Sequence, residues 1–192
     1  MAGRRTSPAL NWKTSLRQAL SPRLDGRPPR LAVVGIGQRL RGDDGAGPAV
    51  VGRLAGLPPD AALLRLDAGH APENCLGPII RFRPDVILLI DAARGEGAPG
   101  TIVWLRPDEA DGRGGSTHTL SLAMLAGYLA AETEAAVHIL GIEPANVAFG
   151  EGLSPAVAQA VAEVAATIAG YWRKLSTACS AMASGKASVV NT

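Results

Sequence analysis

The chain has 192 residues, of which 47% are hydrophobic and 19% charged, so it is long and apolar enough for one domain with a substantial core. Its formal net charge is +2, but seven of its nineteen basic residues precede Leu31. The remainder is slightly acidic, which excludes a nucleic-acid-binding core. Cys75 and Cys179 form no CxxC pair, so neither a disulfide framework nor a thiolate metal site is expected.

The apolar segments are too short or too interrupted to cross a membrane. Residues 120–131 are short, and residues 157–172 are broken by Gln159 and Glu163. The basic N-terminus is followed by Ser, Pro, Gln and Arg rather than by the apolar run of a signal peptide. We therefore expect a cytoplasmic protein without a membrane span.

Both ends of the chain differ in composition from its centre. Residues 1–30 are rich in Arg, Ser and Pro, which predicts a flexible basic leader with one short helix near residues 12–20. Residues 174–192 are rich in Ser and Ala, which predicts a flexible tail. Residues 31–173 are then expected to form the single folded domain.

The stretch around which the chain is organised is LAVVGIGQRLRGDDGAGPAVVGRL, residues 31–54. It predicts a buried strand, a glycine-rich turn and a helix, with Asp43 as the helix N-cap. Asp44 leaves the helix axis about 100° away from Asp43 and is expected to point over the edge of the sheet. A dinucleotide fingerprint fits poorly, because Leu40 stands where the third glycine belongs and the two acids would repel a pyrophosphate.

Strand and helix patterns alternate along the rest of the chain. Strands are predicted at residues 62–66, 86–90, 101–105 and 137–142, the third of these being an edge or antiparallel strand, and helices at 72–82, 120–131 and 153–172. This alternation predicts an α/β fold, a three-layer α/β/α sandwich around a mostly parallel twisted sheet of about five strands.

Three polar side chains are expected at strand tips or helix starts, namely Asp44, Asp91 and His118. Two carboxylates and an imidazole suit a borderline divalent ion such as nickel or zinc and leave positions open for a substrate. Each also has a structural alternative: a first-turn acid for Asp44, a turn cap for Asp91, a helix-start residue for His118. His138 lies inside a predicted strand and is interpreted as a core or surface residue rather than a ligand.

Five motifs of the chain, taken together, resemble those of a known family. VVGIGQRLRGDDGAGP, DAGHAPEN, RPDVILLIDAARGEGAPG, STHTL and LGIEPANVAFGEGLSPAV together are similar to the [NiFe]-hydrogenase maturation proteases. The branch that processes the large subunit of formate-hydrogenlyase-type hydrogenases, the hydrogenase 3 branch, is the most similar. The resemblance covers residues 31–172 in order and without large gaps.

The resemblance implies an aspartic-type endopeptidase that removes the C-terminal extension of the hydrogenase large-subunit precursor after nickel insertion. It assigns Asp44, Asp91 and His118 to catalysis and metal binding, and Asp67 to substrate recognition or activity. We expect Gly69 and His70, beside Asp67, to take part in substrate recognition at the rim of the site, with an added metal ligand as the alternative role of His70. The nickel could arrive with the substrate, with zinc or cadmium as surrogates. The chain departs from the family pattern at the rim of this site, where Gln38 replaces an asparagine, Ala68 a glycine and His70 a Ser or Thr.

Two other functions are compatible with the sequence. The first is a nickel-dependent accessory protein or chaperone of hydrogenase assembly that binds the precursor without cutting it. The second is a nucleotide-binding α/β protein, which the acidic GDDG turn disfavours. For the protease we expect a monomer whose partner is the precursor and which binds no nucleic acid.

Overall fold

The computed structural model describes residues 11–107 and 121–187. Five strands form one sheet in the order β2-β1-β3-β5-β4. Their bounds are β1 (Leu31–Ile36), β2 (Leu63–Gly69), β3 (Val86–Ala92), β4 (Ile102–Leu105) and β5 (Ala136–Ile142). All neighbouring pairs are parallel except β4, which lies antiparallel to β5 at one edge. The predicted mostly parallel α/β sheet is confirmed, including its antiparallel edge strand.

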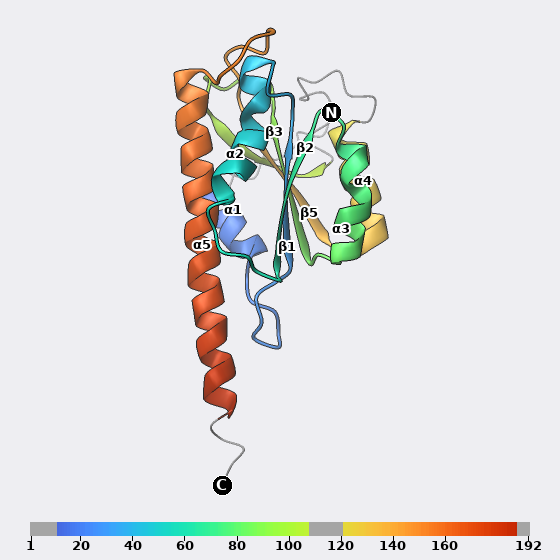
Figure 1. The fold of residues 1–192 in the computed structure, drawn as a ribbon, viewed down its shortest axis with the longest axis vertical. Coiled ribbons are helices and arrows are strands. Elements are labelled where there is room, and N and C mark those ends of the chain that lie inside the picture. Colours follow the sequence, from blue (N-terminus) through green and yellow to red (C-terminus); the bar gives the residue numbers. More distant parts are fainter. Residues whose placement is uncertain (1–10, 108–120, 188–192) are drawn as a thin grey trace, which may run out of the picture.

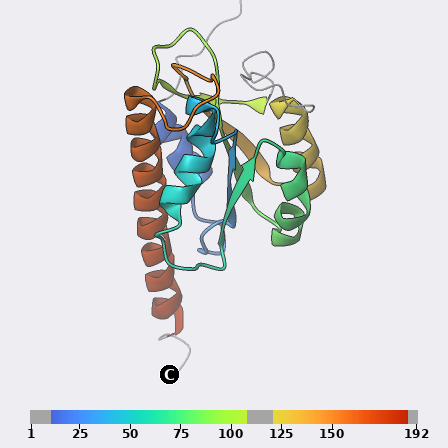
Figure 2. The ribbon, with the colours of Figure 1, turned by 45° about the horizontal axis from the view of Figure 1, so that its top comes forward.

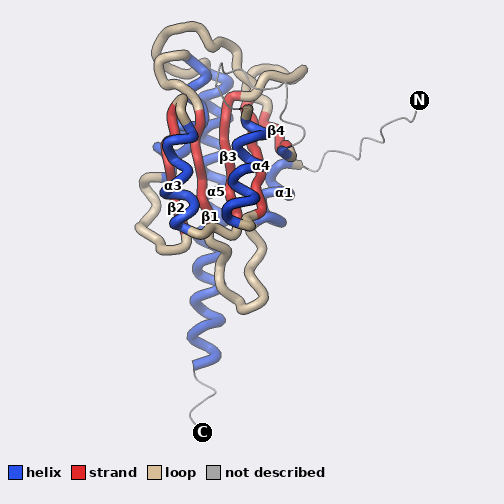
Figure 3. Tube along the Cα trace, turned by 90° about the vertical axis from the view of Figure 1, so that its right-hand side faces the viewer, coloured by secondary structure: helices blue, strands red, loops and turns tan. Residues whose placement is uncertain are grey.

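Helices cover both faces of the sheet, as Figures 1 and 3 show. One face carries α1 (Trp12–Ala19), α2 (Ala46–Leu54) and α5 (Pro155–Ala187), and the other carries α3 (Leu76–Phe82) and α4 (Leu122–Thr133). Two short 3-10 turns, η1 (Gly42–Gly45) and η2 (Pro72–Cys75), precede α2 and α3. The helix predicted over residues 72–82 therefore begins as a 3-10 turn and becomes α-helical only at Leu76.

The two central strands, β1 and β3, are buried along their whole length. Successive side chains of a strand point to opposite faces. Val33 and Leu88 accordingly pack with α2 and α5, while Val34 and Leu89 pack with α3 and α4. A central parallel strand needs apolar residues on both faces, which is why these strands read as continuous aliphatic runs rather than as alternating ones.

Helix α2 approaches the sheet closely through Gly47. A Cβ atom on Gly47 would collide with the carbonyl oxygens of Ile36 and Ile90. Gly47 therefore allows the start of α2 to lie directly over the carboxyl ends of β1 and β3. This contact fixes the position of the η1 turn, which immediately precedes the helix.

The first helix is part of the folded domain. Trp12, Leu16 and Leu20 are buried in the same core cluster as α5, and Lys13 forms a 2.8 Å ion pair with Glu163 of α5. The short helix predicted near residues 12–20 is confirmed, but the expectation of a flexible leader is wrong from residue 11 onward. The apolar residues recur every four positions, and they bury one face of the helix despite the basic composition.

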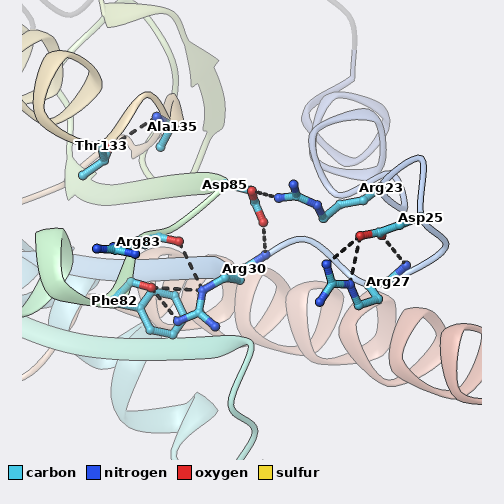
Figure 4. Close-up of polar contacts among 9 residues, drawn as sticks. All are labelled: Arg23, Asp25, Arg27, Arg30, Phe82, Arg83, Asp85, Thr133 and Ala135. Carbon is cyan, nitrogen blue, oxygen red and sulfur yellow. Dashed lines mark hydrogen bonds and ion pairs between the residues drawn. The ribbon is translucent and has the colours of Figure 1, made fainter.

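The segment that connects α1 to β1 is held by Asp85, at the amino-terminal end of β3 (Figure 4). Asp85 pairs with the guanidinium of Arg23 and accepts the backbone N–H of Arg30 at 2.7 Å. The Arg30 guanidinium lies 4.4 Å from the centroid of the Phe82 ring and donates to the Phe82 carbonyl at 2.5 Å. These contacts fix the chain before it enters the sheet.

Helix α5 continues well past the predicted end at residue 172 and extends beyond the sheet (Figure 1). Ile168 and Trp172 lie in the core, Leu175 packs against it, and Cys179 is buried. The spacing of four, three and four residues keeps these side chains on one helical face. The predicted flexible tail is therefore wrong up to Ala187. No helix in the described parts of the chain is both long and apolar enough to cross a membrane.

Candidate active site

The candidate site lies at the carboxyl edge of the sheet, where β3 delivers Asp91. Its side chain is 2% exposed, and its Oδ1 accepts the backbone N–H of Ala92 at 2.8 Å. In register, Asp91 lies beside Gly141 of β5. The position at a strand tip agrees with the sequence prediction.

Asp44 reaches the same edge from the η1 turn. It is 4% exposed, and its Oδ2 accepts the backbone N–H of Gln38 at 2.7 Å. The turn can close this tightly because Gly37 has a φ of +125° and lies directly against the backbone carbonyl of Asp44, where a Cβ atom would clash. The glycine at position 37 thus lets the chain fold Asp44 back toward the strand tips.

Asp44 and Asp91 interact electrostatically. Burial, together with the nearby Asp44 carboxylate, raises the pKa of Asp91 to about 8. One of these two neighbouring acidic groups is protonated at neutral pH. The pair can therefore hold a proton, or it can bind a divalent cation whose charge offsets the cost of ionising both carboxyl groups. The structure therefore brings together two of the three predicted site residues.

His118 lies outside the described residues, so its place relative to this pair stays a prediction. Within residues 11–107 and 121–187, no group of three or more His, Cys, Asp or Glu side chains gathers as a metal site would require. His138, interpreted from the sequence as a structural residue, is half-buried on β5 with its ring 4.9 Å from that of Trp104. Burial lowers the pKa of His138, which favours its neutral form.

Asp43 has a different role from the predicted one. It makes no capping contact in its own helix, and its Oδ2 accepts the backbone N–H groups of Ala145 and Asn146 at 2.8 and 2.9 Å. Its Oδ1 accepts the N–H of Ser154 at 2.6 Å. Although burial opposes ionisation, these backbone N–H groups lower the pKa of Asp43. Asp43 therefore anchors the loop between β5 and α5 over the start of α2 (Figure 2).

The predicted recognition residues Asp67, Gly69 and His70 lie at the end of β2, beside the glycine-rich turn. Gly69 accepts the backbone N–H of Gly37 at 2.8 Å through its carbonyl oxygen. Asp67 and His70 are exposed, so they border the buried carboxylate pair rather than joining it. Asp67 accepts from Nη2 of Arg39 at 2.8 Å.

Arg39 is a site residue that sequence reasoning missed. Its Nη2 also donates to the carbonyl of Pro48 at 3.0 Å, so one guanidinium joins the turn after β1, the end of β2 and the start of α2. The side chain is mostly exposed, and the pair with Asp67 orients the loop more than it stabilises the protein. The only available signal was a basic residue within a glycine-rich turn, which identifies no partner.

Comparison with known proteins places the chain in a family. The family model HycI, described as hydrogenase maturation protease, matches residues 49–171. The hydrogenase 3 maturation protease of Escherichia coli is 33% identical over 137 residues, which cover 71% of this chain and 86% of the relative. The chain belongs to the hydrogenase maturation proteases. The resemblance seen in the sequence is thereby confirmed, and the chain is a protease rather than a non-cutting accessory protein.

Solved structures share the fold of this protease. The crystal structure of the [NiFe] hydrogenase maturation protease HycI from Thermococcus kodakarensis superposes with a TM-score of 0.74 at 29% identity, covering 83% of this chain and 99% of that one. The hydrogenase maturating endopeptidase HybD from E. coli gives a TM-score of 0.64 at 27% identity, covering 76% and 93%. The α/β architecture around the Asp44–Asp91 pair is therefore that of solved maturation proteases.

Proposed function

We propose that this protease removes the C-terminal extension from the large-subunit precursor of a [NiFe] hydrogenase, and that it does so after nickel has been inserted into the precursor. Family membership supports the reaction class. The observation that carries the proposal further is the buried Asp44–Asp91 pair at the carboxyl edge of the sheet, where parallel α/β proteins bind their ligands. We propose that the protease acts in the cytoplasm and as a monomer.

In this proposal the nickel belongs to the substrate, and Asp44, Asp91 and His118 bind it. Two carboxylates and an imidazole are suitable ligands for nickel, and zinc or cadmium could substitute for it. The fit rests on the donor set: a carboxylate has about four lone-pair sites, and the backbone N–H groups of Gln38 and Ala92 each use one. The ion would polarise the scissile carbonyl when bound.

The residues of the chain then make cleavage depend on whether the precursor carries nickel. At neutral pH Asp91 holds a proton, because its pKa is about 8 beside Asp44. A precursor that carries a divalent cation favours the ionised form of Asp91, whereas a nickel-free precursor leaves the acid protonated. An ionised carboxylate at this place can accept the proton of an attacking water. Selectivity for the loaded precursor follows from the burial of the pair.

We further propose that Asp67, Gly69 and His70 contact the precursor beside the pair. Their support is their position: they are at the end of β2, next to the turn that carries Asp44, and Asp67 and His70 are exposed. Because Arg39 neutralises Asp67, His70 is the side chain in this group that is expected to distinguish one precursor from another.

The test is the intact mass of the precursor before and after incubation with the protease. Asp44→Ala, Asp91→Ala and His118→Ala should each leave the nickel-loaded precursor uncut, because each loses a ligand. Glu163→Ala, which removes an acid on α5 that pairs with Lys13, is the matched control and should cut normally. Normal processing by all three site variants would refute the assignment of the site.

A further inference from the structure

Two large apolar side chains are exposed beside the candidate active site. Leu40 is 45% exposed in the turn after β1, and Phe149 is 83% exposed in the loop after β5. The backbones of these two segments are joined: Gly150 N–H donates to the Leu40 carbonyl, and Gly42 N–H donates to the Gly150 carbonyl, both at 2.9 Å. The two residues therefore belong to one surface although they are distant in the sequence.

An isolated β-bridge brings the two segments together. It joins Arg41 and Gly150, so Leu40 and Phe149, the residues just before them, lie on adjacent segments of backbone. Arg41, next to Leu40, is half-buried and turns its Nε to the carbonyl of Val147 at 3.2 Å. We name the two exposed apolar side chains on these adjacent segments the Leu40–Phe149 patch.

The loop that carries Phe149 has the composition of a binding surface. Residues 144–150, PANVAFG, contain no charged side chain. Depletion of charge and the presence of an aromatic side chain are typical of the centre of protein interfaces. The carboxylate of Asp43 fixes the loop through three backbone N–H groups, so binding there would order little additional chain.

The patch is joined to the turn that carries Asp44. The backbone N–H of Asp44 donates to the carbonyl of Arg41, the neighbour of Leu40, at 3.1 Å, and the loop of Phe149 is bound by Asp43, the neighbour of Asp44. We propose that the Leu40–Phe149 patch binds an apolar side chain of an extended segment of the protein substrate, and so positions the chain that leads to the scissile bond. This inference rests on the proposed function, because the occupant is the substrate that the Asp44–Asp91 pair processes.

The test compares Phe149→Ser and Leu40→Ser with the wild type, using the nickel-loaded large-subunit precursor as substrate. Leu24→Ser is the matched control: Leu24 is an exposed leucine in the segment between α1 and β1, at the amino-terminal end of the sheet. All three side chains are exposed, so the fold should be retained, which circular dichroism and the melting temperature check. Binding is measured separately on an Asp91→Asn background, which is expected not to cut.

We expect Phe149→Ser to raise both KM and the Kd of the precursor about 10- to 100-fold, the effect of removing a buried aromatic contact, with kcat within about twofold. Leu40→Ser should raise them less, and the double variant should lose less than the product of the two single effects, because the two side chains share one partner. The Leu24→Ser control should bind and cut like the wild type.

The outcomes separate the two proposals. If the wild type cuts and both patch variants have its KM and Kd, the patch proposal is refuted and the proposed function stands. If the wild type binds without cutting and the patch variants weaken binding, the proposed function fails and the patch stands. Absence of binding and cutting refutes both. Self-association of the protein that Phe149→Ser abolishes, with precursor binding unchanged, would instead assign the patch to a second copy of this chain.

Discussion

Replacing Asp91 with asparagine is expected to stabilise the metal-free protein at neutral pH while it stops processing. The folded protein must keep the Asp91 carboxyl protonated or bear a buried charge beside Asp44, whereas the unfolded chain ionises it freely. Asparagine has nearly the same shape and carries no charge, and its Oδ1 can still accept the Ala92 N–H. The substitution should therefore remove the free-energy cost of burying the Asp91 carboxyl group beside Asp44, which the wild type bears for its function.

The size and sign follow from the two pKa values of Asp91, 3.8 in the unfolded chain and about 8 in the folded protein. A pKa raised on folding contributes stability that is complete below 3.8 and is lost as the pH rises toward about 8. By pH 7 the loss is about 4 kcal/mol, and at pH 4.5 it is only about 1 kcal/mol. Asp91→Asn does not bear this loss, so its free energy of unfolding should exceed that of the wild type by an amount that grows from about 1 kcal/mol at pH 4.5 to about 4 kcal/mol at pH 7.

The assay is guanidinium chloride unfolding of both proteins in EDTA at pH 4.5, 6, 7 and 8, with equal m-values as the check on two-state behaviour. Asp44→Asn serves as a second variant: it removes the charge next to Asp91, so the pH range over which stability is lost should move downward. A stability difference between Asp91→Asn and the wild type that does not change with pH would refute the reasoning.

Three further substitutions test the framework of the site. Asp43→Asn should lower the free energy of unfolding by about 2–4 kcal/mol at pH 7 in a denaturant titration, because it weakens three hydrogen bonds to the loop. Since folding lowers the pKa of Asp43, this difference in stability between the wild type and the variant should shrink as the pH falls through the range of the carboxyl pKa values. Gly47→Ala should cost more than about 2 kcal/mol and displace α2, which hydrogen exchange of the Ile36 and Ile90 region would report. Trp12→Ala should cost about 3 kcal/mol and lower the melting temperature, whereas an unchanged melting temperature would mean that α1 does not contribute to the core.

The features that were predictable from the sequence are those encoded locally. The strand from Val86 to Ala92 reads as buried because its aliphatic run suits only a central parallel strand. The same run identified Asp91, since a polar residue directly after it must lie at the edge of the sheet. Asp44 was identified by its place at the start of the helix after a glycine-rich turn, about 100° around the helix axis from Asp43.

The features that were missed depend on contacts between distant residues. Asp43 binds the N–H groups of residues about one hundred positions away, and its local sequence is equally that of a helix cap. Arg39 pairs with Asp67 for the same non-local reason. At the chain ends the signal was present but was outweighed by composition: Leu175 and Cys179 continue the apolar face of α5 within a Ser- and Ala-rich stretch.

In the proposed mechanism, the Asp44–Asp91 pair makes processing depend on nickel carried by the substrate. The most direct test incubates the protease with nickel-loaded and nickel-free large-subunit precursor from the same genome and records the intact mass of each. We expect loss of a C-terminal peptide from the loaded precursor alone, and from neither precursor when the protease is Asp91→Asn. Cleavage of both precursors would support the protease activity but contradict its dependence on nickel. Cleavage of neither precursor by the wild type would contradict the proposed substrate.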